Sequence, residues 1–181
     1  MQRHEETLHR ACLDYLRASL RYDRETGVFT WAKDNILSGG AKVVSAGDRA
    51  GTINADGYRQ IQLKIDGRKR GFKEHRLAWL FVHGKWPTNQ IDHINGDRAD
   101  NRIVNLREAT NSQNMMNRKL NANSGSGVKG VSFHHGTQRW RARLQCNGKR
   151  IHLGDFKNKE AAEIAYEAAA KRHFGEFARL K

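Results

Sequence analysis

Residues 91–97, near the middle of the chain, read Ile-Asp-His-Ile-Asn-Gly-Asp. An apolar residue precedes the adjacent Asp92 and His93, and the Asn-Gly pair after them is typical of a tight turn. Neighbouring side chains on a strand point to opposite faces. We therefore predict a strand that ends at Asp92-His93, so that the loop after it lets both side chains approach one target.

The segment before this stretch has the pattern of a β-hairpin followed by a helix. Residues 58–65 alternate between two faces, and Asp66-Gly67 is a strong two-residue turn signal. Residues 75–82 predict a buried helix, which Gly84 and Pro87 end. The hairpin tip carries a basic run that reads either as a solvated turn or as a phosphate contact: Arg68, Lys69 and Arg70.

The N-terminal part predicts a helix and a second small hairpin. Apolar residues recur at helical spacing over residues 8–20. A turn at residues 25–27 then joins two short β-prone pieces, of which residues 28–31 are the clearer.

Charge points to the class of partner. The 181 residues carry a formal net charge of +14, and an excess of this size on a short chain favours a nucleic acid partner over charge that serves only solubility.

No apolar run is long enough to span a bilayer, and the N-terminus lacks a signal-peptide core, so we expect a cytoplasmic protein. Cys12 and Cys146 are far apart and predict free thiols and no structural zinc.

The C-terminal third is predicted to form a separate module. Residues 121–127, rich in Asn, Ser and Gly, indicate a linker. Beyond it we predict strands near residues 130–133, 140–146 and 149–153, and a helix over residues 159–174.

A stripe of basic residues marks one face of this module. Trp140, Ala142 and Leu144 alternate with arginines, so the first set is predicted to pack on the helix while the arginines face outward. A solvated sheet face is the alternative reading. Residues 128–181 hold 12 Lys and Arg against 5 Asp and Glu, which is half of the chain's excess charge. The predicted DNA contacts are Arg139, Arg141, Arg143, Lys149 and Arg150.

The central segment resembles the HNH nuclease family, in particular its phage and intron-encoded homing-endonuclease branch. The resemblance runs from residues 75–78 through residues 92–96 and 105–107 to Thr110 and Asn114. It implies two strands and a helix around one divalent metal ion, and cleavage of a DNA phosphodiester bond.

The resemblance also implies a role for each matching residue. His93 would be the general base, Asp92 and Asn114 the metal ligands, and Asn105 a brace for the loop that orients His93. Oxygen ligands suit Mg²⁺ or Mn²⁺. Three further residues, Asp97, Asp100 and Asn101, are interpreted as turn and cap residues, and His75 is interpreted as structural.

The C-terminal module resembles the plant ethylene-response-factor (APETALA-type) DNA-binding domain. The matching pieces are residues 129–131, 140–142, 152–156 and 160–166. That fold lays a three-stranded sheet into the DNA major groove. Ser132, Phe133 and His134 replace the arginines of the plant pattern, so the plant domain's preferred DNA sequence does not carry over.

These observations predict an α+β chain in four parts: a helix and β-hairpin region (residues 1–70), a ββα-metal HNH core (71–120), a linker (121–127) and a three-stranded sheet plus helix (128–181). The predicted function is a metal-dependent endonuclease acting on duplex DNA. One alternative is a non-catalytic, sequence-specific DNA-binding protein, and another is an RNA-binding or RNA-cleaving protein. The sequence leaves the oligomeric state open, with a monomer favoured.

Overall fold

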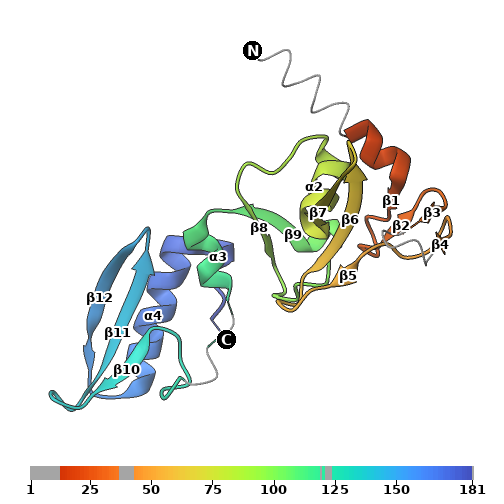
Figure 1. Cartoon of the computed structure of the whole chain (residues 1–181). Helices are drawn as coiled ribbons and strands as arrows, with labels where there is room; N and C mark the ends of the chain where they lie inside the picture. The colour runs from red at the N-terminus through yellow and green to blue at the C-terminus, as the bar shows by residue number, and fades with distance from the viewer. Residues whose placement is uncertain (1–12, 37–42, 119, 121–123, 181) are drawn as a thin grey trace. The chain divides into compact units, whose positions relative to one another are not determined.

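The computed structural model describes residues 13–36, 43–118, 120 and 124–180 (Figure 1). The chain divides into two compact units, residues 1–108 and 109–181, and each has its own hydrophobic core. The boundary falls before the predicted linker, of which residues 121–123 lie outside the described residues, as does Cys12. In the described part of the chain, no helix is long and apolar enough to cross a membrane.

The first unit opens with a helical segment at residues 13–19 and the antiparallel strands β1 (Leu20–Tyr22) and β2 (Phe29–Trp31). Gly27, with φ of 72°, closes the turn between them. This confirms the predicted small hairpin. The strands β3 (Asn35–Ile36) and β4 (Val43–Val44) pair next to it.

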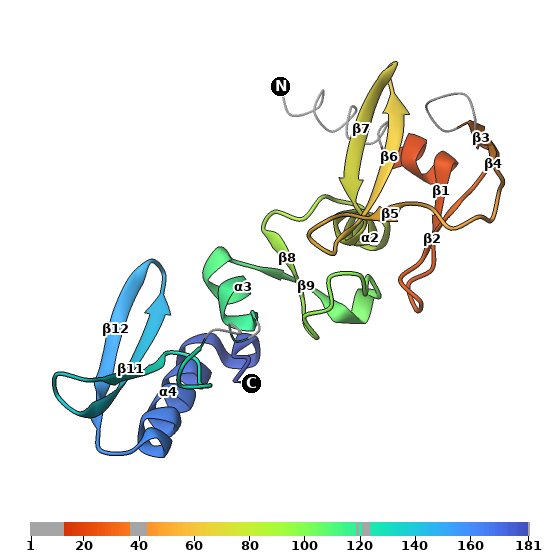
Figure 2. The same ribbon diagram turned by 60° about the horizontal axis from the view of Figure 1, so that its bottom comes forward.

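A three-stranded sheet follows, in the order β5 (Thr52–Ile53), β6 (Arg59–Ile65), β7 (Arg68–Lys73). β6 and β7 form a long antiparallel hairpin whose turn, Asp66-Gly67, has positive φ at both residues, as a tight two-residue connection requires (Figure 2). Ile61 and Leu63 are buried, whereas the side chains that alternate with them are more exposed. The predicted hairpin is confirmed.

Helix α2 (Glu74–His83) begins directly after β7 and supplies the centre of the first core. Leu77, Ala78 and Leu80 are buried against Phe29 and residues of β6. Fully burying a Leu or Phe side chain stabilises a fold by roughly 1.5–3 kcal/mol. Gly84 caps the helix in the left-handed conformation, at the predicted end.

The predicted strand before the loop is β8 (Gln90–His93), and it ends at His93 as expected. A loop and the 3-10 helix η1 (Ile103–Asn105) lead to β9 (Leu106–Ala109), which pairs with β8.

The second unit begins with helix α3 (Asn111–Asn117), whose N-terminus is fixed by a capping box between Thr110 and Gln113. An antiparallel sheet of β10 (Val131–His134), β11 (Arg139–Cys146) and β12 (Lys149–Phe156) follows. Helix α4 (Lys159–Phe174) covers one face of this sheet, and η2 (Gly175–Phe177) follows it (Figure 1).

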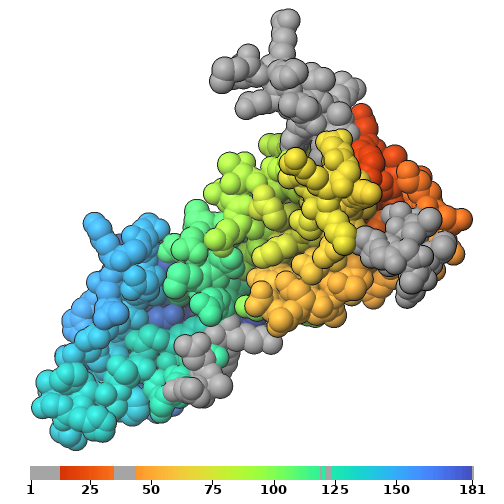
Figure 3. All heavy atoms as spheres, in the orientation of Figure 1, coloured from red at the N-terminus to blue at the C-terminus, as the bar shows by residue number. Residues whose placement is uncertain are grey.

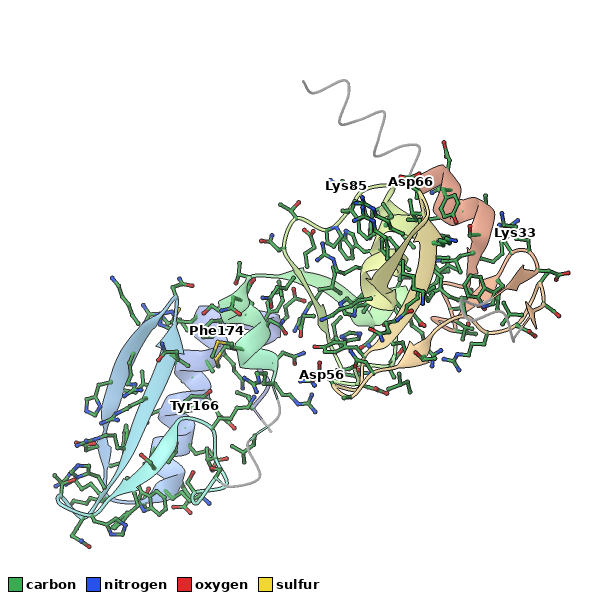
Figure 4. All side chains as sticks on the ribbon, viewed as in Figure 1. Lys33, Asp56, Asp66, Lys85, Tyr166 and Phe174 are labelled. Carbon is green, nitrogen blue, oxygen red and sulfur yellow. The ribbon has the colours of Figure 1, made fainter. Side chains whose placement is uncertain are left out.

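The second core lies between α4 and the sheet. Tyr166 and Phe174, labelled in Figure 4, are buried together with Ala142 and Leu144 of β11. Met116 of α3 belongs to the same core. The mixed helix-and-sheet content is therefore as predicted, and the last three strands and α4 lie close to their predicted ranges.

Candidate functional site

The end of β8 places two of the predicted site residues inside the first unit. Asp92 and His93 expose only 4% and 5% of their surface. The strand stops there because the Gly96 amide donates to the His93 carbonyl at 2.8 Å, which closes a turn. On the neighbouring strand, Arg107 Nε donates to Asp92 Oδ2 at 3.0 Å, so the carboxylate is held by a guanidinium.

The loop after His93 is built from side chains that bond nearby backbone amides. Asn95 Oδ1 accepts from the Asp97 amide at 2.8 Å, and Asp97 Oδ1 accepts from the Ala99 amide at 2.9 Å. Hydrogen bonds from Arg102 lower the pKa of Asp100 to about 2. Asp97 and Asp100 are therefore turn residues, as interpreted from the sequence.

Asn105 makes the contacts expected of a brace. Its Oδ1 accepts from the Asn95 amide at 3.0 Å, and its Nδ2 donates to the Asp100 carbonyl at 2.8 Å. Its backbone carbonyl accepts from the Ile94 amide at 2.9 Å. Both ends of the loop are thus tied to one residue.

The side chain that meets His93 is that of Asn101, and here the turn-residue interpretation is wrong. Asn101 is 1% exposed, and its Oδ1 lies 3.3 Å from His93 Nε2. Its Nδ2 donates to Glu74 Oε2 at 3.2 Å. In sequence Asn101 follows an aspartate in a turn-rich stretch, so local pattern gave no signal of this role.

Glu74 and Arg59 form a buried ion pair behind Asn101. Arg59 Nε donates to both Glu74 oxygens, at 3.1 and 3.0 Å, and Glu74 is fully buried. Burial raises the pKa of the Glu74 carboxyl, and the bonds from Arg59 and Asn101 oppose that rise. The alternation of residues 58–65 puts Arg59 on the same face as Ile61 and Leu63, but it does not predict the partner of Arg59.

Two aromatic groups line the other sides of His93. The His75 and His93 rings meet edge to face at 5.1 Å, and the Tyr58 ring lies 5.9 Å from His93. Burial lowers the pKa of His93, and it lowers that of His75 to about 3. Both imidazoles are therefore neutral at physiological pH, which is the form that can accept a proton.

The proposed metal donors are oxygens from a carboxylate and a carboxamide. A carboxylate has about four lone-pair sites, so Asp92 can accept from Arg107 and also bind a cation. Asn114 lies half-buried on α3, in the second unit. Hard oxygen donors fit Mg²⁺ or Mn²⁺, which keep several waters. Among the described residues, no three His, Cys, Asp or Glu side chains cluster as a metal site.

The predicted DNA contacts lie on two surfaces. In the first unit, the basic run at the start of β7 is exposed, and the hairpin, yellow in Figure 3, lies at the surface. In the second unit, Arg139, Lys149 and Arg150 are exposed and Arg143 is half-buried. A hollow of about 400 Å³ is lined by four residues, Arg141, Arg143, Arg150 and His152.

Arg141 differs from the other arginines of β11. It donates through Nε and Nη2 to the two carboxylate oxygens of Asp155 on β12, at 2.7 and 3.0 Å. This pairing raises the pKa of Arg141 and lowers that of Asp155. The ladder between β11 and β12 also shifts register between Ala142 and Arg143. Arg141 is therefore fixed in place by its neighbour across the sheet.

Comparisons with known proteins relate part of this chain to nucleases. Residues 72–116 match the model of the HNH endonuclease family. The chain is 29% identical to Protein 3.8 of Escherichia phage T7 over 113 residues, 60% of this chain and 90% of that protein. It is 32% identical over 106 residues to an uncharacterised HNH endonuclease, L560, of Acanthamoeba polyphaga mimivirus, covering 58% of this chain but only 54% of the relative.

A solved structure is also similar, that of the HNH homing endonuclease I-HmuI, described for its DNA binding and cleavage. It is 28% identical, with a TM-score of 0.37, and the match covers 55% of this chain and 51% of that one. The matched family segment runs from β7 to α3 and contains Asp92, His93 and Asn114. Residues 72–116 are therefore similar to the HNH endonuclease family.

Proposed function

We propose that this protein is a metal-dependent endonuclease that cleaves duplex DNA. The observation that carries the proposal is the buried pair Asp92 and His93 at the end of β8, inside the segment that matches the HNH endonuclease family. An aspartate and a neutral histidine at the end of one strand supply a hard cation ligand and a proton acceptor.

In this mechanism His93 accepts a proton from the water that attacks the phosphorus atom. Its depressed pKa keeps the imidazole neutral and ready for that step. Asn105 holds both ends of the loop beside it. Asp92 and Asn114 would hold the divalent cation, which supplies charge stabilisation to the phosphate and the leaving oxygen.

The basic surfaces would hold the DNA. The first is the basic run of β7, Arg68, Lys69 and Arg70, and the second is the arginine-rich face of β11 and β12, with Arg139, Arg141, Arg143, Lys149 and Arg150. The resemblance of the second unit to a plant-type DNA-binding domain supports a role in DNA binding. Joining a DNA-binding module to a nuclease module raises the local concentration of DNA at the nuclease site.

The test is cleavage of supercoiled plasmid with Mg²⁺ or Mn²⁺. We expect the wild-type protein to nick or cut the plasmid, and His93→Ala to be about 10²- to 10⁴-fold slower, as loss of a general base predicts. DNA binding, measured by gel shift, should stay within a few-fold. His83→Ala, at an exposed histidine of α2, is the matched control and should cut like the wild type.

Two alternatives give different results in the same experiment. A DNA-binding protein without activity would show binding but equal, background cleavage by the wild type and His93→Ala. An RNA-directed protein would lose its complex with labelled duplex DNA to structured RNA competitor at lower concentration than to unlabelled duplex. Either result would overturn the proposal.

A further inference from the structure

The structure assigns a positioning role to Asn101: backed by Glu74 and Arg59, it fixes the His93 imidazole with its proton on Nε2. Nδ1 is then the nitrogen that accepts a proton. The role of that nitrogen as a base rests on the proposed nuclease function, whereas the fixed tautomer can be measured without any activity.

The direction of each hydrogen bond follows from Glu74. An ionised carboxylate only accepts hydrogen bonds, so the Asn101 group that faces it at 3.2 Å must be the Nδ2 amide. The opposite orientation would place the carboxamide oxygen against a negative charge. The Asn101 oxygen therefore faces His93, and a bond at 3.3 Å between this acceptor and Nε2 requires an N–H on that nitrogen.

Arg59 holds the Glu74 carboxylate in place and favours its ionised form. The Arg59 guanidinium bonds both carboxylate oxygens through Nε, and its Nη2 donates to the Ala50 and Gly51 carbonyls at 3.0 and 3.2 Å. Gly51 has no side chain, and a Cβ there would overlap Glu74 Oε1. The carboxylate thus lies in a cradle that leaves little room for another orientation.

The backbone of Asn101 is held from the opposite side by the first hairpin. The Tyr22 hydroxyl donates to the Asn101 carbonyl at 2.7 Å, and the Ile103 amide donates to the Arg24 carbonyl at 3.2 Å. Gly27 packs so closely on the Asn101–Arg102 peptide that a Cβ would overlap it. Residues 22–27 therefore hold the backbone at residues 101–103.

Burial makes the arrangement selective for one tautomer. Asn101, Glu74 and His93 expose 1%, 0% and 5% of their surface. In such surroundings a polar group without its partner is costly, and bulk water cannot replace the lost bond. The tautomer of His93 that places an N–H against the Asn101 oxygen is therefore strongly favoured over the tautomer that places a lone pair there.

The first readout is the ¹H–¹⁵N spectrum of the His93 side chain in the full-length protein at about neutral pH. We expect one Nε2–H signal, protected from exchange with water, and an unprotonated Nδ1. In Asn101→Leu, which keeps the volume but removes the acceptor, the protected Nε2–H signal should be lost. A wild-type proton on Nδ1, or a protected Nε2–H unchanged in Asn101→Leu, would overturn the inference.

Tyr22→Phe is the matched control because it loosens the same loop without touching His93. We expect it to keep the protected Nε2–H. If Asn101→Leu fails to fold, the double variant Arg59→Met/Glu74→Gln replaces the ion pair by neutral groups of similar size. A Gln side chain can present either group to Asn101, so the Nε2–H signal should broaden or an Nδ1–H form should appear. An unchanged signal would contradict the inference.

The second readout is plasmid cleavage under saturating DNA. We expect Asn101→Leu to lower kcat by about 10- to 100-fold, the usual effect of removing a group that orients a functional imidazole, with KM within about three-fold. A wild-type protein that cleaves nothing but keeps the protected Nε2–H would refute the nuclease proposal and leave this inference standing. A cleaving wild type whose Asn101→Leu variant retains full kcat would refute the positioning role.

Discussion

His75 is a buried histidine whose Nδ1 has no hydrogen-bond partner among the described residues. It is 5% exposed, and its ring contacts the rings of both Tyr58 and His93. An unpartnered buried polar atom costs roughly 1–3 kcal/mol, so His75 Nδ1 lowers the stability of the folded state. Burial also lowers its pKa to about 3, because a charged imidazole there would lose its hydration.

The pH dependence of stability should reveal this histidine. Its folded pKa of about 3 lies below the ordinary value of 6.5, so the unfolded chain binds more protons between these limits. Above pH 6.5 the titration of His75 does not reduce the free energy of unfolding. As the pH drops below 6.5, His75 lowers that free energy by about 2 kcal/mol for each 1.5 pH units. We expect His75→Phe to flatten this slope in urea unfolding between pH 7 and pH 5.

His83→Gln, at the exposed end of α2, is the control for that series. It should keep the wild-type slope. A His75→Phe protein that loses stability with falling pH as steeply as the wild type would show that His75 does not stay neutral in the fold.

Gly51 adopts a left-handed backbone conformation next to the buried Glu74 carboxylate. Its φ of 77° is matched by the 75° of Gly67, but a Cβ at Gly51 overlaps Glu74 whereas one at Gly67 meets nothing. We expect Gly67→Ala to cost about 1 kcal/mol from backbone strain alone. Gly51→Ala should cost about 2–4 kcal/mol because steric conflict is added. Equal losses in urea unfolding would show that the cradle around Glu74 can relax.

At the scale of elements, regular strands and helices were the predictable part. Period-two alternation and Asp66-Gly67 predicted the β6–β7 hairpin, and the Asn-Gly turn predicted the end of β8. The contacts of Asn101 and Arg59 were not predictable, because each depends on partners 8 to 27 residues away that only the folded arrangement brings together. Local pattern also cannot assign Met116 to a core, and this residue packs in the second unit.

The exposed start of β7 allows a prediction about DNA binding. Neutralising three phosphate contacts should reduce the slope of log K against log salt by about 2–3. We therefore expect the triple variant Arg68→Gln/Lys69→Gln/Arg70→Gln to bind duplex DNA more weakly and with that shallower slope. The control, Lys157→Gln/Lys171→Gln/Arg172→Gln, removes the same charge from exposed positions that we do not assign to DNA binding. Equal slopes for both variants would mean that the hairpin acts only through net charge.

At the scale of the whole molecule, the family segment and the structural unit differ in extent. The HNH match covers residues 72–116, whereas the first unit begins well before it and ends at residue 108. Residues 128–181, which lie within the second unit, carry half of the net charge of +14. Each unit has a hydrophobic core and exposed basic residues, which fits the proposal that both units bind one polyanion.

The buried ion pair of Arg59 and Glu74 limits how residues 72–116, the segment that matches the HNH family, can be transferred to another protein. A graft of residues 72–116 would import Glu74 but leave behind its counter-ion and the Tyr22 hydroxyl that anchors the Asn101 carbonyl. Removing one partner of a buried ion pair typically destabilises a protein by about 3–5 kcal/mol. We expect such a chimera to be recovered folded only when the recipient also receives residues 20–28 and 50–74, which can be scored by circular dichroism and thermal melting.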